Sequence, residues 1–258
     1  MDDVEVAKKL VKDIRRAKHV DDPAGEDETA VDLTNALEML SEELYSKPAH
    51  FILELIQNAD DNRYATAVTP KLSLLYREDG YLWVGINELG FTEANVRAIC
   101  RIAASTKKVE NQQKGYIGEK GIGFKSVFKV ADVVWVKSGA MSFTFDKNKP
   151  LGMIAPEWTD AFPPTSISER TMFCFKIPNQ DDRGIVRANL LELKPELLIF
   201  LRQLRNIDVK VQNAASATLQ HFSLSKSDAQ MSGTRRTTLQ IISITPRLST
   251  VSDTLIVF

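Results

Sequence analysis

The chain has 258 residues, of which 43% are hydrophobic and 26% are charged, a composition typical of globular proteins with a buried core. Lysine and arginine number 33, and aspartate and glutamate number 34, so net charge does not mark the chain for nucleic acid or for an anionic membrane. No apolar stretch approaches the roughly 20 residues that a membrane-spanning helix needs. The N-terminal segment is charged and amphipathic, unlike a signal peptide.

The two cysteines indicate the compartment in which the protein works. Cys100 and Cys174 each stand inside an apolar run, and we expect both to be buried free thiols in a reducing compartment. We therefore expect an intracellular protein, cytoplasmic or nuclear, with neither a membrane nor a nucleic acid as partner.

Both helical and strand periodicities occur along the chain. Helices are predicted over residues 4–14, 32–45, 49–62 and 92–105, the last with Thr92 as its N-cap. Strands are predicted over residues 71–78, 81–87, 130–138, 142–147 and 171–177. A helix over residues 184–204 follows, with Pro195 starting its second part, and the remaining strands are predicted over residues 207–211, 219–225 and 237–244.

This order favours an α/β (α+β) two-layer sandwich, with helices on one face of a mixed, mainly antiparallel sheet. The long helices cluster early instead of alternating with strands, which disfavours a doubly wound parallel sheet. We divide the chain into a first domain over residues 1–205, with an N-terminal helical extension, and a strand-rich tail over residues 206–258. The tail is treated as the start of a second domain.

Four of the 12 glycines fall in the segment "GYIGEKGIGFKSVF", residues 115–128, which we call the glycine segment. Closely spaced glycines let main-chain N–H groups approach an anion, and a helix that begins there adds its positive end. The P-loop pattern fails by one residue, because Phe124 stands before Lys125, and the dinucleotide pattern fails at Ser126. A phosphate cradle and a tight structural turn both remain open on this segment alone.

A second segment, "ELIQNADD", places Glu54, Asn58 and Asp61 on one stripe of a helix, since they are four and three residues apart. A solvated polar face is one interpretation. The other is that an amide oxygen and carboxylates converge on hydrated Mg²⁺, which prefers hard oxygen ligands. One carboxylate could then orient an attacking water.

Taken together, the two segments resemble the GHKL ATPases, the group of gyrase B, the ninety-kilodalton heat-shock chaperone, histidine kinases and MutL. "ELIQNADD" is similar to the N-box of that group, E-x-x-x-N-A-x-D, and "IGEKGIGFKSVFKVADVV" is similar to the chaperone's glycine box and its following helix. Within the group, the chain most resembles the sacsin and plant "no vein" type, particularly its fungal relatives. The likeness spans residues 4–204 and is most specific over residues 40–134. It implies the Bergerat ATP-binding fold.

The resemblance implies a role for each matching residue. Glu54 would be the general base, Asn58 would coordinate Mg²⁺, Asp61 would join the water network near the nucleotide, and Thr171 would support the adenine end. Residues of the ATP lid would be Ser105, Thr106 and Lys107. Gly118, Gly121 and Gly123 would wrap the triphosphate with main-chain N–H groups, and Lys125 could reach a phosphate. The other expected cofactor-binding residues around these motifs are Gly90, Gly115, Glu119, Lys120, Ile122 and Phe124.

One position departs from the group's pattern. In the GHKL group, the second glycine box supplies an aspartate that accepts a hydrogen bond from the adenine amino group. Alignment of "GINELGF" on Gly90 puts Ile86 at the position of that aspartate. Asn87 and Glu88 are neighbours that could substitute, and an Asn carbonyl can accept the same hydrogen bond without charge.

The sequence therefore predicts a Mg²⁺-dependent ATP-binding domain, a slow ATPase that couples lid closure to conformational change in a chaperone-like or regulatory protein. The alternative is a degenerate nucleotide-binding module without turnover. A histidine kinase is disfavoured, because no dimerisation helix with a phospho-accepting His is apparent upstream. Expected ligands are ATP and Mg²⁺, and the resemblance allows a nucleotide-dependent dimer, while the protein client is not identified.

Overall fold

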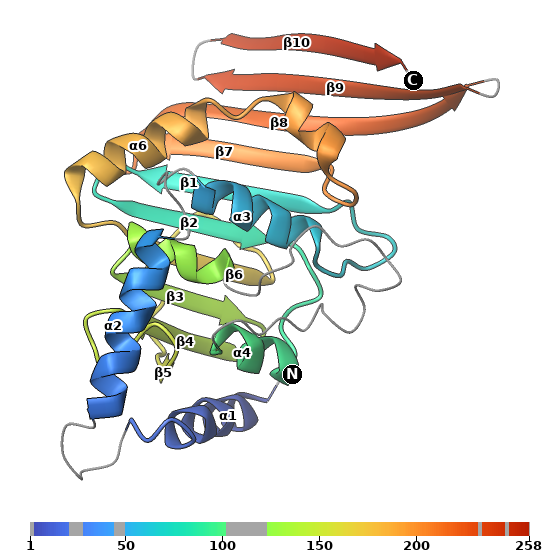
Figure 1. The fold of residues 1–258 in the computed structure, drawn as a ribbon. Coiled ribbons are helices and arrows are strands. Elements are labelled where there is room, and N and C mark those ends of the chain that lie inside the picture. The colour runs from blue at the N-terminus through green and yellow to red at the C-terminus, as the bar shows by residue number, and fades with distance from the viewer. Residues whose placement is uncertain are drawn as a thin grey trace.

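A ten-stranded sheet organises the part of the chain that the computed structural model describes, namely residues 3–20, 28–43, 50–101, 123–231, 234–245 and 248–257. Its strands lie in the order β10-β9-β8-β7-β1-β2-β6-β3-β4-β5 (Figure 1). In chain order they are β1 (Lys71–Arg77), β2 (Tyr81–Ile86), β3 (Val133–Ser138), β4 (Met141–Asp146), β5 (Glu157–Trp158), β6 (Thr171–Lys176), β7 (Asn206–Gln212), β8 (Thr218–Met231), β9 (Thr234–Thr245) and β10 (Leu248–Val257).

Strand directions agree with the sequence-based prediction of a mixed, mainly antiparallel sheet. Only β1 and β7 run parallel, and every other pair of neighbouring strands is antiparallel. The parallel pair joins the two halves of the sheet, because residues far apart in sequence, Lys71 and Asn206, lie opposite each other there. The tail from residue 206 thus continues the same sheet through β7 to β10, and its status as a second domain stays a prediction.

The helices gather on one face of the sheet, which confirms the predicted two-layer arrangement (Figure 1). The α-helices are α1 (Val4–Arg16), α2 (Glu28–Glu43), α3 (His50–Asp60), α4 (Glu93–Ile99) and α6 (Gln180–Leu191), and the 3₁₀ helices are η2 (Gly123–Lys129) and η3 (Pro195–Phe200). In the described residues, no helix has the length and apolar character needed to cross a membrane.

Some helix boundaries differ from the prediction for local reasons. The predicted helix over residues 184–204 divides into α6 and η3, and Pro195 occupies the first turn of η3 as expected. The α6 helix begins earlier than predicted because the Asn179 side chain accepts hydrogen bonds from two main-chain N–H groups and caps it. Helical character after Gly123 takes the 3₁₀ form.

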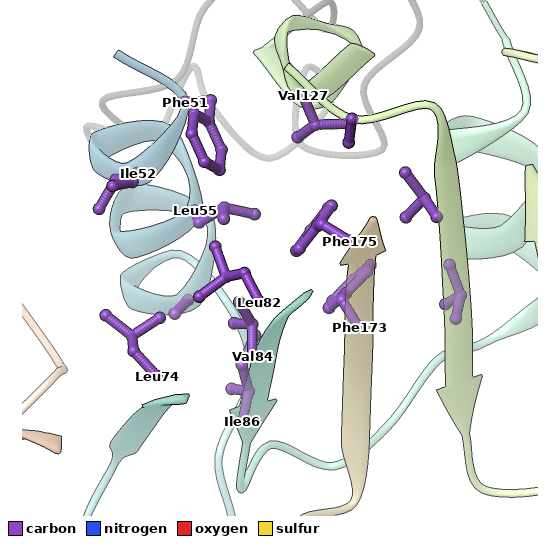
Figure 2. Packing of buried hydrophobic residues seen from close by; sticks show 14 of the residues in the cluster. Phe51, Ile52, Leu55, Leu74, Leu82, Val84, Ile86, Val127, Phe173 and Phe175 are labelled. Atoms are coloured by element: carbon purple, nitrogen blue, oxygen red, sulfur yellow. The ribbon is translucent and has the colours of Figure 1, made fainter. Parts of the chain in front are cut away.

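The main core lies between α3 and the sheet. The predicted apolar side of α3, Phe51, Ile52, Leu55 and Ile56, is at most 5% exposed. Figure 2 shows Phe51 and Leu55 of α3 on one side of this core, with Phe175 of β6 and Val127 of η2 across from them. The Phe51 and Phe175 rings meet edge to face, with centroids 6.3 Å apart. Side-chain burial therefore fixes which side of α3 remains polar.

Both cysteines are buried free thiols, as the sequence predicted. Cys100 belongs to the main core, and burial raises the pKa of its thiol to about 11. Cys174 lies in a second, smaller core with Leu75 and Trp83. Successive side chains of a strand point to opposite faces of a sheet, and these three residues point to the face away from the main core. The sheet therefore has apolar packing on both faces.

A buried carboxylate ties the end of α3 to the segment before β7. Asp60 is 1% exposed and accepts hydrogen bonds from the main-chain N–H groups of Arg202 (2.9 Å), Gln203 (2.7 Å) and Leu204 (2.8 Å). The Gln203 side chain donates in return to the carbonyl oxygen of Asp60 at 2.8 Å. Charge-assisted hydrogen bonds to a carboxylate are stronger than neutral ones, so this clasp strongly restrains the end of α3.

Asp60→Ala should lower the free energy of unfolding by about 3–5 kcal/mol, because three main-chain donors lose their acceptor. Asp60→Asn should cost less, since one side-chain oxygen remains. Urea denaturation measures both, with the exposed Asp32→Ala as the control that should change stability by under about 0.5 kcal/mol. A cost for Asp60→Ala as small as that of the control would contradict the clasp.

Candidate functional site

Glu54 and Asn58 lie one turn apart on the polar side of α3, and both are half-buried. The four apolar residues of α3 face the sheet, so these two side chains flank the core instead of entering it. A carboxylate and an amide four residues apart on a helix stand beside each other. The spacing thus allows these positions to present two oxygen donors of the type that Mg²⁺ prefers on one side of α3.

Glu54 also touches the end of the glycine segment that the structure describes. A Cβ added to Gly123 would lie 3.1 Å from the Glu54 carboxyl carbon and closer still to its Oε2 oxygen. A side chain at residue 123 would occupy the space of the carboxylate, so the end of the Glu54 side chain would have to move aside to admit one. The structure therefore joins the two segments that the sequence analysis singled out.

Lys125 has a different place from the one expected for a phosphate ligand. Its side chain is 4% exposed, and Nζ donates to the carbonyl oxygens of Ile99 and Met153, both at 2.6 Å. Burial lowers the pKa of this ammonium to about 7. We therefore replace the expected phosphate contact with a structural role, because the ammonium is directed into the protein.

Phe124 lies in a series of aromatic contacts over the sheet. Its ring centroid is 5.8 Å from that of Phe173, which in turn is 6.0 Å from that of Phe91. Phe91 directly follows Gly90, and Phe124 directly follows Gly123, so the contacts connect the two glycine motifs. Aromatic packing sets the spacing between the two ends of the candidate site.

At the other end, Thr171 is fully buried and its hydroxyl lies 2.7 Å from that of Ser138. The Ser138 hydroxyl also accepts a hydrogen bond from the main-chain N–H of Phe91 at 2.8 Å. Gly90 has φ +93°, and an added Cβ would lie 3.3 Å from the Ser138 oxygen, so glycine suits both the backbone conformation and the space. These contacts join β3, β6 and the loop after β2.

The residues near the expected adenine-reading position occupy distinct environments. Ile86 is 3% exposed and lies opposite Thr171 in the sheet. Asn87 is engaged elsewhere: its Oδ1 accepts from the N–H of Lys71 at 2.8 Å, and its Nδ2 donates to the carbonyl of Thr69 at 2.9 Å. The amide of Asn87 therefore holds the start of β1, and its expected contact with a base stays a prediction.

Glu88 is 8% exposed and lies near Tyr64. Burial raises the pKa of the Tyr64 hydroxyl, and the negative charges of Glu88 and Asp60 raise it further. That hydroxyl donates to the carbonyl of Ala59 at 2.6 Å. Glu88 thus contributes to a negative environment at the end of α3.

Asp61 forms an ion pair with the guanidinium of Arg202, and only 3% of its side chain is exposed. The expected place of Asp61 on a water network stays a prediction, whereas the pairing gives it a structural partner. Sequence reasoning missed the neighbouring Asp60, the more deeply buried of the two. The signal was present as the doublet "DD" at the end of a predicted helix, but it does not say which carboxylate turns inward.

Nine expected site residues lie outside the described part of the chain and stay predictions. They are Ser105, Thr106, Lys107, Gly115, Gly118, Glu119, Lys120, Gly121 and Ile122. Within the described residues, no group of three or more His, Cys, Asp or Glu side chains is arranged to hold a metal ion. A Mg²⁺ ion here would therefore need the Asn58 amide oxygen together with ligands from outside the described residues, such as water and phosphate oxygens.

Comparison with known proteins adds independent information. The family model described as "Sacsin domain" matches residues 30–158. "Protein NO VEIN" of Arabidopsis thaliana is 39% identical over 197 residues, which are 68% of this chain and 7% of that protein. "Chaperone protein HtpG" of Halalkalibacterium halodurans is 31% identical over 126 residues, 41% of this chain and 20% of that protein. The chain thus spans a small part of either relative.

A solved structure titled "Crystal Structure of N terminal domain of a DNA repair protein" aligns with a TM-score of 0.46 and 12% identity. The alignment covers 81% of this chain and 72% of that chain.

The contact between Glu54 and Gly123 can be measured by a double-mutant cycle. Gly123→Ala should cost about 1 kcal/mol or less in the wild-type background, because the added methyl group makes the end of the Glu54 side chain change its rotamer. In a Glu54→Ala background the same change should cost little, since the space is vacant. Urea denaturation of the four proteins gives the coupling energy.

Gly184→Ala is the matched control for that cycle, because nothing lies within 4 Å of its added Cβ. Gly184 is inside α6, so alanine there should raise stability by about 0.4–1 kcal/mol. Equal costs of Gly123→Ala in the two backgrounds would show that the glycine and the carboxylate do not touch.

Proposed function

Because the chain belongs to the sacsin-domain family, we propose that it is a Mg²⁺-dependent ATP-binding domain and a slow ATPase. The observation that carries this proposal is the approach of Gly123 to the Glu54 carboxylate. Main-chain N–H groups without a neighbouring Cβ suit a phosphate, and an adjacent carboxylate suits the water that attacks it. The similarity to HtpG supports the same interpretation.

Each residue of the proposed site has one task. The amide oxygen of Asn58 would hold Mg²⁺, which when bound supplies positive charge to the phosphate oxygens. Glu54 would orient the attacking water and accept its proton. Gly123, with the preceding part of the glycine segment, would provide main-chain donors, and Thr171 with Gly90 would support the base.

A nucleotide-binding module without turnover is the second candidate. Ile86 provides no carboxylate at the adenine-reading position, and the Asn87 amide is already bound to main-chain atoms of residues 69 and 71. Both observations weaken base recognition without touching the phosphate end. Intact Glu54 favours the ATPase, so turnover is the property that separates the two candidates.

The wider setting follows from the relatives' names and is also a proposal. The term "chaperone" in the name of HtpG suggests coupling of nucleotide binding to conformational change in a larger protein, with a nucleotide-dependent dimer as one form of that coupling. The partner would be a protein client. The buried free thiols suit a reducing compartment, and we propose an intracellular location, cytoplasmic or nuclear.

Glu54→Ala should lower the rate of ATP hydrolysis by about 10²–10⁴-fold, because the attacking water loses its general base. Affinity for Mg²⁺-ATP should remain within about two-fold, since the carboxylate does not hold the phosphates. A phosphate-release assay and calorimetric titration measure the two quantities, with the exposed Glu196→Ala as control. Wild-type turnover no greater than that of Glu54→Ala would favour the module without turnover.

Asn58→Ala should abolish the Mg²⁺-dependent part of ATP affinity while leaving the melting temperature unchanged, because Asn58 lies on the polar side of α3. Calorimetric titration with and without Mg²⁺ measures this difference. Should Mg²⁺ strengthen ATP binding equally in the variant and the wild type, Asn58 would not be the metal ligand.

A further inference from the structure

Lys125 connects parts of the chain that are distant in sequence. Its Nζ donates to the carbonyl of Ile99, 26 residues earlier, and to that of Met153, 28 residues later. Ile99 is the last residue of α4, where helix carbonyls carry partial negative charge and attract a cation. One ammonium therefore holds the end of α4 and the segment after β4 to the start of η2.

The surroundings of this ammonium are mainly apolar. Aromatic rings of Phe145, Phe124 and Phe128 have centroids 4.9, 5.4 and 5.9 Å from Nζ, distances at which a cation is attracted to a ring face. The titratable groups that influence it are the Cys100 thiol and the Lys18 ammonium. No carboxylate of the described residues pairs with Lys125, so carbonyl dipoles and rings balance its charge.

The position of Gly123 depends on this anchor through the first turn of η2. The hydroxyl of Ser126 donates to the carbonyl of Gly123 at 2.6 Å, which ties the glycine to the turn that Lys125 occupies. Gly123 is in turn the residue that approaches Glu54. A shift of the Lys125 side chain would therefore move the glycine main chain relative to the carboxylate.

We propose that Lys125 is a positioning residue of the nucleotide site, which sets the distance between Gly123 and Glu54 by binding the main-chain carbonyls of Ile99 and Met153. The inference rests on the proposed function, since it assigns a task within that site. Lys125 acts through Gly123 and does not touch the nucleotide.

The proposal has a signature in pH dependence. The folded-state pKa of Lys125 is about 7, below that of an unfolded lysine, so between these values the unfolded chain binds more protons. Stability should consequently rise with pH from about 7 to about 10, by at most about 1.4 kcal/mol per pH unit. Loss of the charge also weakens both carbonyl hydrogen bonds, so triphosphate affinity should fall over the same range. If Lys125 only stabilised the fold, triphosphate affinity would instead rise with pH together with stability.

The test compares wild type with Lys125→Met, which removes the charge but keeps an unbranched apolar side chain. Titration with Mg²⁺-ATP from about pH 6.5 to about pH 9 should show wild-type affinity falling about ten-fold. This is roughly the loss expected when a charge-assisted hydrogen bond becomes a neutral one. Lys125→Met should bind about ten-fold more weakly at the lowest pH and show a flat profile by comparison. Any titration of ATP itself is common to both proteins.

Two further variants keep the test decisive. Lys129→Met makes the same substitution in the same 3₁₀ helix and should retain the wild-type pH profile. Lys125→Arg keeps a charge that does not titrate in this range, so its affinity should stay high at the upper pH. If Lys125→Met does not fold, the contrast between Lys125→Arg and wild type still measures the effect of the charge.

Three outcomes would overturn the proposal. Lys125→Met that binds Mg²⁺-ATP as tightly as wild type would remove Lys125 from the site while leaving the proposed function intact. Wild-type affinity that rises with pH alongside stability would make Lys125 a stabilising residue only. If the wild-type protein binds no nucleotide at any pH, the proposed function fails, and the positioning role fails with it.

Discussion

Asp60 ends α3 with a carboxylate that accepts hydrogen bonds from the consecutive main-chain amides of Arg202, Gln203 and Leu204. Because those residues lie just before β7, with only Arg205 between, the clasp couples α3 to the parallel pairing of β7 with β1. The apolar side of α3 then determines its rotation about its own axis, since burial of Phe51 and Leu55 against the sheet leaves the opposite side polar. Glu54 is thus held on the polar side of α3, beside Gly123, by constraints that do not involve Glu54 itself.

Buried charges recur around this arrangement, and each has a partner suited to its surroundings. Asp61 meets the guanidinium of Arg202, whereas Lys125 meets carbonyl oxygens and aromatic rings. Removal of one partner of a buried charge is costly, while the intact pair adds little net stability. Such groups are therefore better explained as determinants of where segments lie than as sources of stability. Here they determine where α3, η2 and the end of α4 meet.

The sequence predicted the features that depend on repetition or on a motif. Apolar spacing in α3 identified its buried side, and the mixed sheet with helices on one face followed from the order of elements. Burial of both cysteines was predicted from their apolar neighbours. These features are local, because a helix or strand period can be read within a few residues.

Pairings across the chain could not be predicted in the same way. Nothing near Asn87 indicates that its amide would bind main-chain atoms at residues 69 and 71, because those atoms become neighbours only when β1 and β2 pair. Lys125 was expected at a phosphate, since a long flexible side chain after glycines can turn either way. Its direction depends on Ile99 and Met153, which lie 26 and 28 residues distant. The same holds for Asp60 and Asp61. Neighbouring residues of a helix point in different directions, so the sequence does not say which carboxylate binds the main chain and which pairs with Arg202.

The two ends of the proposed site follow different physical principles. At the proposed phosphate end, glycine leaves the main chain open beside a carboxylate, an arrangement that would suit main-chain N–H groups binding a phosphate. At the proposed base end, one hydrogen bond joins the hydroxyls of Ser138 and Thr171, and Ile86 has an apolar side chain. A base that binds there would meet mainly apolar surface, because both hydroxyls are almost fully buried. Nucleotide affinity at such a site would come mainly from the phosphates, which makes the position of Gly123 relative to Glu54 the quantity that the surrounding fold has most reason to fix.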